Sequence, residues 1–363
     1  MEELRRIDRR TFCRSLALAG ALAPTGAALI ASSGRSAVIE NDRFQIHFDP
    51  SGGTFDVFAG AMPLIRGATA QAETGEGVRS MSQAAYRRTI KTVRVRDAVG
   101  EGRRIVVLAV DGRRRLDFEL HLTVYDALSA AVVEANCRNV SKAPMILQRL
   151  SPLVAGRGNG GGLHRHEAKR LLTNGQLYAD PGALVDVASM QTPVRSWWNV
   201  GLFSGYTQEG LVCGYLRNQS AQGQVEIHRR NGAFSLAADS VLAEGFVLAP
   251  GAAVTSEPFM LNLGPDPYAA LEAYAETMGR LHSARTSSLV NGWCSWFYTF
   301  EHVTEEEVLR NAEFAARELK PLGLEYVQID EGYQRWHGDW EGNDRFPHGM
   351  KWSADQIRAL GLR

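Results

Sequence analysis

Apolar and polar residues alternate one for one along much of the first two thirds of this chain. The clearest stretch runs from Leu116 to Val124, with the sequence LDFELHLTV. A strand points successive side chains to opposite faces, so this alternation gives one face to a core and the other to water. Turn signals stand at Asp49–Gly53, Asp111–Gly112 and Asn231–Gly232. Many strands joined by short turns predict a large antiparallel β-sandwich over residues 36–265.

The sandwich region is followed by a connecting helix and a linker, which together occupy residues 266–288. Asp266 can cap the free amides of a helix, and Pro267 suits its first position. Apolar residues then recur at helical spacing as far as Leu281.

The pattern changes again in residues 289–363, where strands and helices alternate. Strands are predicted at 290–296 and 324–329, the second of them a nearly continuous apolar run. Capping boxes at Thr304–Glu307 and Ser353–Gln356 predict the start of one helix after each strand. Strand, helix, strand and helix at this spacing predict a parallel sheet or barrel.

Two adjacent carboxylates, Asp330 and Glu331, follow the second of these strands. Chemistry in parallel barrels lies at the carboxyl ends of the strands. The next loop, residues 332–352, is long for such a connection and carries Asp339 and Trp340 among other aromatic and acidic residues. Aromatic faces suit sugar rings, and carboxylates accept hydrogen bonds from sugar hydroxyls. From the pattern alone, an acidic turn with core tryptophans is the alternative.

Three motifs occur in order within residues 290–363: NGWCSWFYTF, YVQIDEGYQRWHGDW and RFPHGMKW. Together they resemble the melibiase family of glycoside hydrolases, which includes retaining α-galactosidases and raffinose-synthase-like galactosyltransferases. The resemblance implies a β-sandwich followed by a (β/α)8 TIM barrel, of which residues 289–363 supply the first two βα units. An eight-unit barrel takes about 250 residues, so this part is expected to be incomplete.

The resemblance also implies roles for single residues. Asp330 and Glu331 correspond to paired acids that bind galactose hydroxyls, although the family usually has two aspartates there. Trp296 corresponds to a sugar platform, with a buried barrel-layer tryptophan as the alternative, and Asp339 and Trp340 complete the expected substrate-binding set. The nucleophile and the acid/base come from later strands of the family barrel. They are therefore expected beyond Arg363, no catalytic residue is assigned, and the chain alone is expected to be inactive.

The first residues predict a targeting segment. Arg9 and Arg10 precede a weakly apolar stretch from Leu16 to Ala31, as in a twin-arginine export signal. Residues 1–35 are therefore excluded from the predicted fold. The protein is expected in the periplasm or outside the cell, with no membrane span after signal removal.

Composition limits the remaining classes of function. Lys+Arg and Asp+Glu are both 40, so charge gives no reason to expect a nucleic-acid partner. The 4 cysteines form no CxxC pair, which argues against a zinc framework and a disulfide scaffold and favours buried free thiols. The stretch His164–Glu167 has incomplete ligand spacing for a metal site and is interpreted as a polar loop. No metal and no cofactor are predicted.

The sequence thus predicts an exported glycosidase, an α-galactosidase that hydrolyses terminal α-galactosides of an oligosaccharide or glycoside with retention. Two alternatives stay open: a non-catalytic carbohydrate-binding protein, and a galactosyltransferase of the same family. Assembly into a homo-oligomer is compatible with either.

Overall fold

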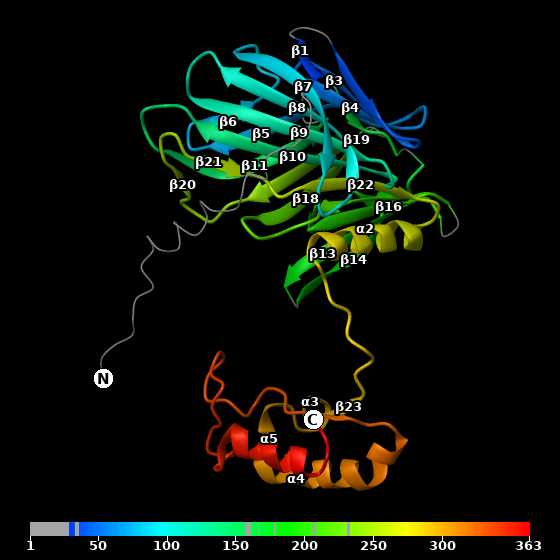
Figure 1. The fold of residues 1–363 in the computed structure, drawn as a ribbon, viewed down its shortest axis with the longest axis vertical. Helices are drawn as coiled ribbons and strands as arrows, with labels where there is room; N and C mark the ends of the chain where they lie inside the picture. Colours follow the sequence, from blue (N-terminus) through cyan, green and yellow to red (C-terminus); the bar gives the residue numbers. More distant parts are fainter. Residues whose placement is uncertain are drawn as a thin grey trace. The chain divides into compact units, whose positions relative to one another are not determined.

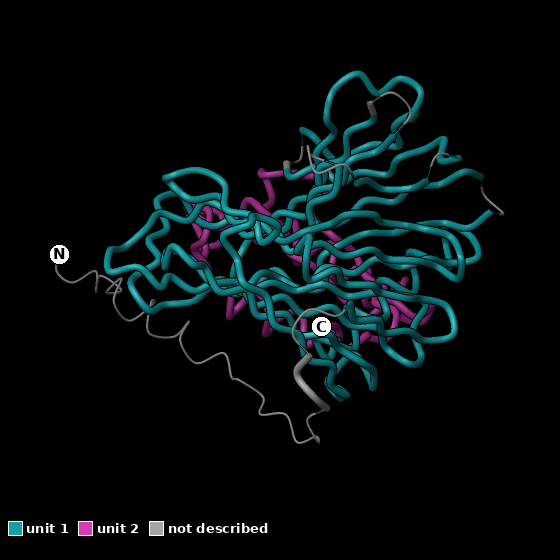
Figure 2. Tube along the Cα trace, turned by 90° about the horizontal axis from the view of Figure 1, so that it is seen from above, with its two compact units in different colours: residues 1–284 teal, residues 285–363 magenta. Residues whose placement is uncertain are grey.

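The structure is a computed structural model. It describes residues 29–32, 36–156, 161–165, 167–177, 179–205, 208–230 and 233–363. The paired arginines of the predicted leader, the Asn231–Gly232 turn and His166 lie outside these residues. Figure 2 shows the division of the chain into two compact units, unit 1 (Met1–Ala284) and unit 2 (Arg285–Arg363).

Unit 1 contains two 11-stranded sheets, in which all recorded pairings are antiparallel (Figure 1). The first sheet has the order β1 (Leu29–Ser32), β7 (Tyr86–Arg96), β8 (Glu101–Asp111), β9 (Leu116–Tyr125), β10 (Ala130–Asn139), β22 (Phe259–Gly264), β17 (Gly210–Tyr215), β16 (Asn199–Phe203), β13 (Arg170–Leu177) and β14 (Asp180–Asp186), and β21 (Ala253–Thr255) pairs with β10. The second sheet has the order β15 (Val194–Trp197), β18 (Gln222–Arg230), β19 (Ala233–Val241), β11 (Met145–Ala155), β5 (Met62–Thr74), β4 (Thr54–Ala59), β3 (Phe44–Asp49) and β2 (Ala37–Glu40), with the short strands β12 (Gly162–Leu163), β20 (Val247–Leu248) and β6 (Gly77–Ser80) beside it.

The predicted alternation is confirmed in β9. Leu120 and Leu122 are fully buried in the core that both sheets share, whereas Glu119 and His121 point to the other face of the sheet. The hairpin expected after Asp111 joins β8 to β9. The antiparallel sandwich is therefore confirmed. Strand β1 extends it into the range predicted as leader, because residues 29–32 pair with β7.

Helix α2 (Pro267–Leu281) begins where the sequence predicts. The Asp266 carboxylate accepts hydrogen bonds from the amides of Tyr268 and Ala269, each at 2.9 Å. Figure 1 shows α2 beside β22 and β16, and Tyr274 of α2 donates a hydrogen bond to the Tyr215 carbonyl oxygen. The helix, predicted as a connection, thus packs as part of unit 1.

The cysteines of the sandwich are buried free thiols, as expected. Cys137 and Cys213 are fully buried, and burial raises the pKa of each thiol to about 12. Both thiols therefore stay protonated at neutral pH.

Among the described helices, none is long and apolar enough to cross a membrane.

A charged cluster occupies the outer face of the first sheet. The Nε2 atom of His121 lies 2.6 Å from Glu119 Oε1, and its Nδ1 atom lies 3.6 Å from Glu134 Oε2. Burial opposes protonation of His121, as does the charge of Arg104. The hydrogen bonds with the two carboxylates outweigh both effects and raise the pKa of His121 above its usual value.

This cluster predicts a pH dependence of stability. A raised pKa in the folded state means that folding favours protonated His121, so its contribution is complete below the unfolded pKa of about 6.5. The contribution is lost as the pH rises through the raised folded pKa. We expect the urea concentration at the midpoint of unfolding of unit 1 to decrease as the pH is raised from 6 to 8.5. We expect His121→Gln to make this midpoint less dependent on pH. An unchanged slope in the variant would refute the assignment.

Unit 2 has a two-stranded parallel sheet covered by helices. Its strands are β23 (Gly292–Cys294) and β24 (Tyr326–Gln328). Its helical segments are α3 (Trp296–Thr299), the 3-10 helix η3 (Phe300–His302), α4 (Glu305–Phe314), the π-helical η4 (Ala315–Leu319), the 3-10 helix η5 (Lys320–Leu322) and α5 (Gly349–Ala359). The predicted order of strand, helix, strand and helix is confirmed. The first strand is shorter than predicted, because Trp296 opens α3.

One predicted helix start in unit 2 is wrong. Helix α5 begins at Gly349, and Ser353, expected as its cap, is buried inside it. The Ser353 hydroxyl instead lies 3.4 Å from Oε2 of the buried Glu305 carboxylate. Glu305 also accepts hydrogen bonds from the backbone amide of His348 at 3.2 Å and lies 2.7 Å from its Nδ1 atom. A carboxylate from α4 therefore caps the start of α5.

Candidate functional site

The two predicted acids lie at the carboxyl end of the parallel strands of unit 2. Strands β23 and β24 run side by side with Cys294 opposite Gln328, so the residues that follow each strand meet at one edge. The Asp330 amide donates a hydrogen bond to the Ser295 hydroxyl oxygen at 2.9 Å. This bond joins the chain after β24 to the chain after β23 and places Asp330 at the carboxyl edge of the two parallel strands.

The Asp330 carboxylate is half-buried and held by its neighbours. Its Oδ2 atom accepts a hydrogen bond from Gln328 Nε2 at 2.9 Å and one from the Cys294 thiol at 3.4 Å. Burial raises the pKa of Cys294, and the carboxylate of Asp330 raises it further. Cys294 is therefore a protonated thiol that donates to Asp330 and helps to orient its carboxylate.

The side chain of Glu331 has other neighbours than that of Asp330. Its Oε1 atom lies 2.8 Å from His337 Nδ1, and its side chain lines a hollow of about 410 Å³. Glu301, His302 and Arg345 line the same hollow. Within unit 2, which is described throughout, Asp330 does not line this hollow. The two adjacent acids thus have separate surroundings.

The long loop after β24 is held in place by hydrogen bonds. Asn343 Nδ2 donates to the carbonyl oxygens of Gly332 and Gln334, at 2.9 and 3.2 Å, and Arg345 Nη2 donates to Gly332 at 2.5 Å. Gly332 has a φ of 108°, and a Cβ there would lie 2.5 Å from the Glu301 carbonyl oxygen. Glycine is needed at this position because the loop passes so close to η3.

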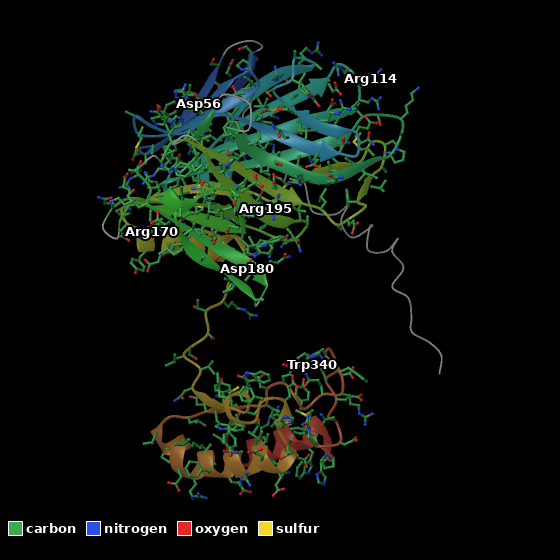
Figure 3. The ribbon with its side chains drawn as sticks, turned by 180° about the vertical axis from the view of Figure 1, so that it is seen from behind. Asp56, Arg114, Arg170, Asp180, Arg195 and Trp340 are labelled. Atoms are coloured by element: carbon green, nitrogen blue, oxygen red, sulfur yellow. The ribbon has the colours of Figure 1, made fainter. Side chains whose placement is uncertain are left out.

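The aromatic residues predicted for the site are only partly gathered there. Trp296 is half-buried and packs edge-to-face on Phe300, with ring centroids 5.4 Å apart. Trp340, labelled in Figure 3, is 84% exposed, and Asp339 beside it is exposed as well. Trp296, Asp339 and Trp340 do not line the hollow beside Glu331. The tryptophan that lines it is Trp336.

Three residues that line the hollow were not predicted as site residues: Glu301, His302 and Arg345. Arg345 belongs to the motif RFPHGMKW, which was a usable signal. Glu301 and His302 carry no such signal, because they reach the hollow only through the close packing of η3 on Gly332. In the described residues, no group of three or more His, Cys, Asp or Glu side chains could hold a metal ion.

No protein-family model matches the chain. Solved structures with a similar fold include the GH36 α-galactosidase AgaA from Geobacillus stearothermophilus, with a TM-score of 0.62 at 12% identity over 91% of this chain and 55% of that one. The α-galactosidase from Lactobacillus brevis matches with a TM-score of 0.60 at 13% identity over 90% of this chain and 54% of that one. The galactosidase domain of the α-galactosidase–sucrose kinase AgaSK matches with a TM-score of 0.65 at 11% identity over 93% and 56%.

These likenesses confirm, at the level of fold, the resemblance that the three motifs predict. The chain spans about half the length of the solved structures it matches. The chain therefore has the fold of one part of the GH36 α-galactosidase structures, and this part consists mostly of β-strands.

Proposed function

We propose that this chain is part of an exported glycoside hydrolase that acts on terminal α-galactosides with retention, and that unit 2 begins its (β/α)8 barrel. The observation that carries the proposal is the position of Asp330, two residues beyond the end of β24 at the carboxyl edge of two parallel strands. The three motifs and the likeness in fold support the same assignment. Structures of AgaA variants with raffinose and stachyose support an α-galactoside as the substrate class.

In this proposal Asp330 and Glu331 bind substrate and are not the reacting pair. Retention needs a nucleophilic carboxylate and an acid/base carboxylate about 5–5.5 Å apart on opposite sides of the scissile bond. Asp330 is already oriented by Gln328 and Cys294, which suits an acceptor for sugar hydroxyls. The nucleophile and the acid/base would come from later barrel strands, and the reaction would pass through a covalent glycosyl intermediate.

The test uses the protein as it occurs in its native cells, captured with an antibody to unit 1. We expect it to hydrolyse p-nitrophenyl α-galactoside and to be heavier than this 39.8 kDa chain. Asp330→Asn should lower kcat/KM about 10- to 100-fold, because a hydrogen bond to a charged group contributes about 1.5–3 kcal/mol. Asp344→Asn, in the same loop but with a fully exposed side chain, should have no effect.

Three results would count against the proposal. Sugar binding without turnover by the native protein would favour the non-catalytic carbohydrate-binding alternative. Transfer of galactose to a sugar acceptor in preference to water would favour the galactosyltransferase. An activity equal in Asp330→Asn and wild type would remove Asp330 from the site.

Export by the twin-arginine route is also part of the proposal, supported by Arg9 and Arg10 ahead of a weakly apolar stretch. Replacing both arginines by lysine should leave the protein in the cytoplasmic fraction of its native cells, because the route requires the arginine pair. The measurement is the distribution of the protein between cell fractions on an immunoblot. Normal export of the double variant would contradict this assignment.

A further inference from the structure

Unit 1 has a hollow of its own, with a volume of about 620 Å³. It lies on the outer face of the second sheet, over β2 to β4 and the beginning of β5. In β3 and β4 the core-facing residues are buried, and of the residues between them His47, Thr54 and Asp56 line this hollow. The side chains that matter for its chemistry are Val38, His47, Asp49, Asp56 and Arg66. Figure 3 labels Asp56 in unit 1.

Asp56 provides a carboxylate with a fixed orientation. Its Oδ2 atom lies 2.8 Å from Arg66 Nε, and its Oδ1 atom accepts a hydrogen bond from the Gly67 amide at 2.7 Å. An ionised carboxylate has about four acceptor sites, so these two donors leave capacity for a ligand. The side chain is 23% exposed, which makes that capacity reachable from the hollow.

The imidazole of His47 and the guanidinium of Arg66 both pack on the ring of Phe58. The rings of His47 and Phe58 have centroids 4.8 Å apart, and Arg66 Cζ lies 5.6 Å from the centroid of Phe58. The His47 Nε2 atom is 3.3 Å from Gln45 Oε1. Val38, which is 50% exposed, adds an apolar surface. The guanidinium of Arg66, the imidazole of His47 and the carboxylate of Asp56 are thus held by their neighbours, and Val38 adds an apolar surface beside them.

The charged side chains that line the hollow indicate which class of ligand it could bind. Two carboxylates, Asp49 and Asp56, and one guanidinium, Arg66, line the hollow, so it is poorly suited to phosphate or another anion. A metal ion is also a poor fit, since the described residues contain no cluster of three or more His, Cys, Asp or Glu able to hold one. Fixed donors and acceptors beside an apolar surface suit a neutral ring that carries both hydroxyl and C–H groups.

We propose that this hollow binds a neutral pyranose ring, at a carbohydrate site distinct from that of Asp330 and Glu331. Asp56 would accept hydrogen bonds from two ring hydroxyls, Arg66 would donate to a third oxygen, and Val38 would contact the C–H face. The proposal does not depend on hydrolase activity, because no residue of the hollow belongs to unit 2.

The test is a ligand-observed NMR titration of the whole chain with raffinose and with maltose. Every sample carries Asp330→Asn, so that the site in unit 2 is weakened. We expect this background to bind at least one of the sugars, and the addition of Asp56→Asn to raise its Kd at least tenfold. Asp180→Asn is the matched control, since Asp180 is exposed at the start of β14 (Figure 3), and it should leave Kd unchanged.

A second variant keeps the test decisive if Asp56→Asn fails to fold. His47→Ala removes the imidazole that lies directly across from Asp56 in the β3–β4 pair, and in a folded chain it should also weaken sugar binding. Unchanged sugar affinity in a folded Asp56→Asn or His47→Ala chain would overturn the proposal. Binding of inorganic phosphate but of neither sugar would show that the ligand class is wrong. Galactoside hydrolysis is measured separately, so either proposal can fail while the other stands.

Discussion

Replacing Phe259 by alanine is expected to lower the free energy of unfolding of unit 1 by about 3–5 kcal/mol. Phe259 lies on β22, between β10 and β17, and its side chain is fully buried in the core between the two sheets. Its ring packs on Tyr215 at a centroid distance of 5.1 Å and an interplanar angle of 66°. Truncation removes both the buried apolar area and this aromatic contact, and it leaves a cavity that strands on either side cannot close.

This loss is a large share of the roughly 5–15 kcal/mol that stabilises a typical domain. Urea unfolding followed by far-ultraviolet circular dichroism measures it. Leu108→Ala is the control: Leu108 lies on β8 of the same sheet but points outward and is 41% exposed. We expect the control to change stability by less than about 0.5 kcal/mol. A change below about 1 kcal/mol for Phe259→Ala would mean that the two sheets do not pack at this position.

Replacing Glu305 by alanine is expected to destabilise the start of helix α5 by about 2–4 kcal/mol. The buried carboxylate lies within reach of the backbone amide and ring of His348 and of the Ser353 hydroxyl. Its removal leaves the His348 amide without this acceptor. It also removes a negative charge from a helix N-terminus, where such a charge is favourable. Amide hydrogen exchange in residues 349–359 should become roughly 30- to 700-fold faster, since 1.4 kcal/mol corresponds to a factor of ten.

Glu306→Ala is the matched control for this prediction. Glu306 is the next residue of α4 and is exposed, so its truncation should leave hydrogen exchange in α5 unchanged. The stacking of His348 on Trp352, with centroids 4.2 Å apart, provides a second readout through tryptophan fluorescence. Equal protection of α5 in Glu305→Ala and wild type would show that the helix is capped by other groups.

Local patterns predicted much of the secondary structure. The period-two alternation in β9 and the capping of α2 by Asp266 depend only on neighbours in the chain, and both are confirmed. The position of Asp330 and Glu331 at a strand end could be predicted for the same reason, because a buried apolar run marks the strand and the first polar residues mark its exit. The motif resemblance agrees with the fold that solved structures share with this chain.

Long-range contacts account for the remainder. Strand β22 inserts between β10 and β17, far from both in sequence, and no local pattern specifies that partner. The capping signal at Ser353–Gln356 fails because the buried Glu305 carboxylate, from another helix, caps α5 one turn earlier.

Residue spacing along the chain was therefore enough to predict the order of strands and helices in unit 2 and the place of the two acids. The pairing of the strands, the separate surroundings of Asp330 and Glu331 and the hollow around Asp56 depend on packing between distant segments, which spacing along the chain does not encode.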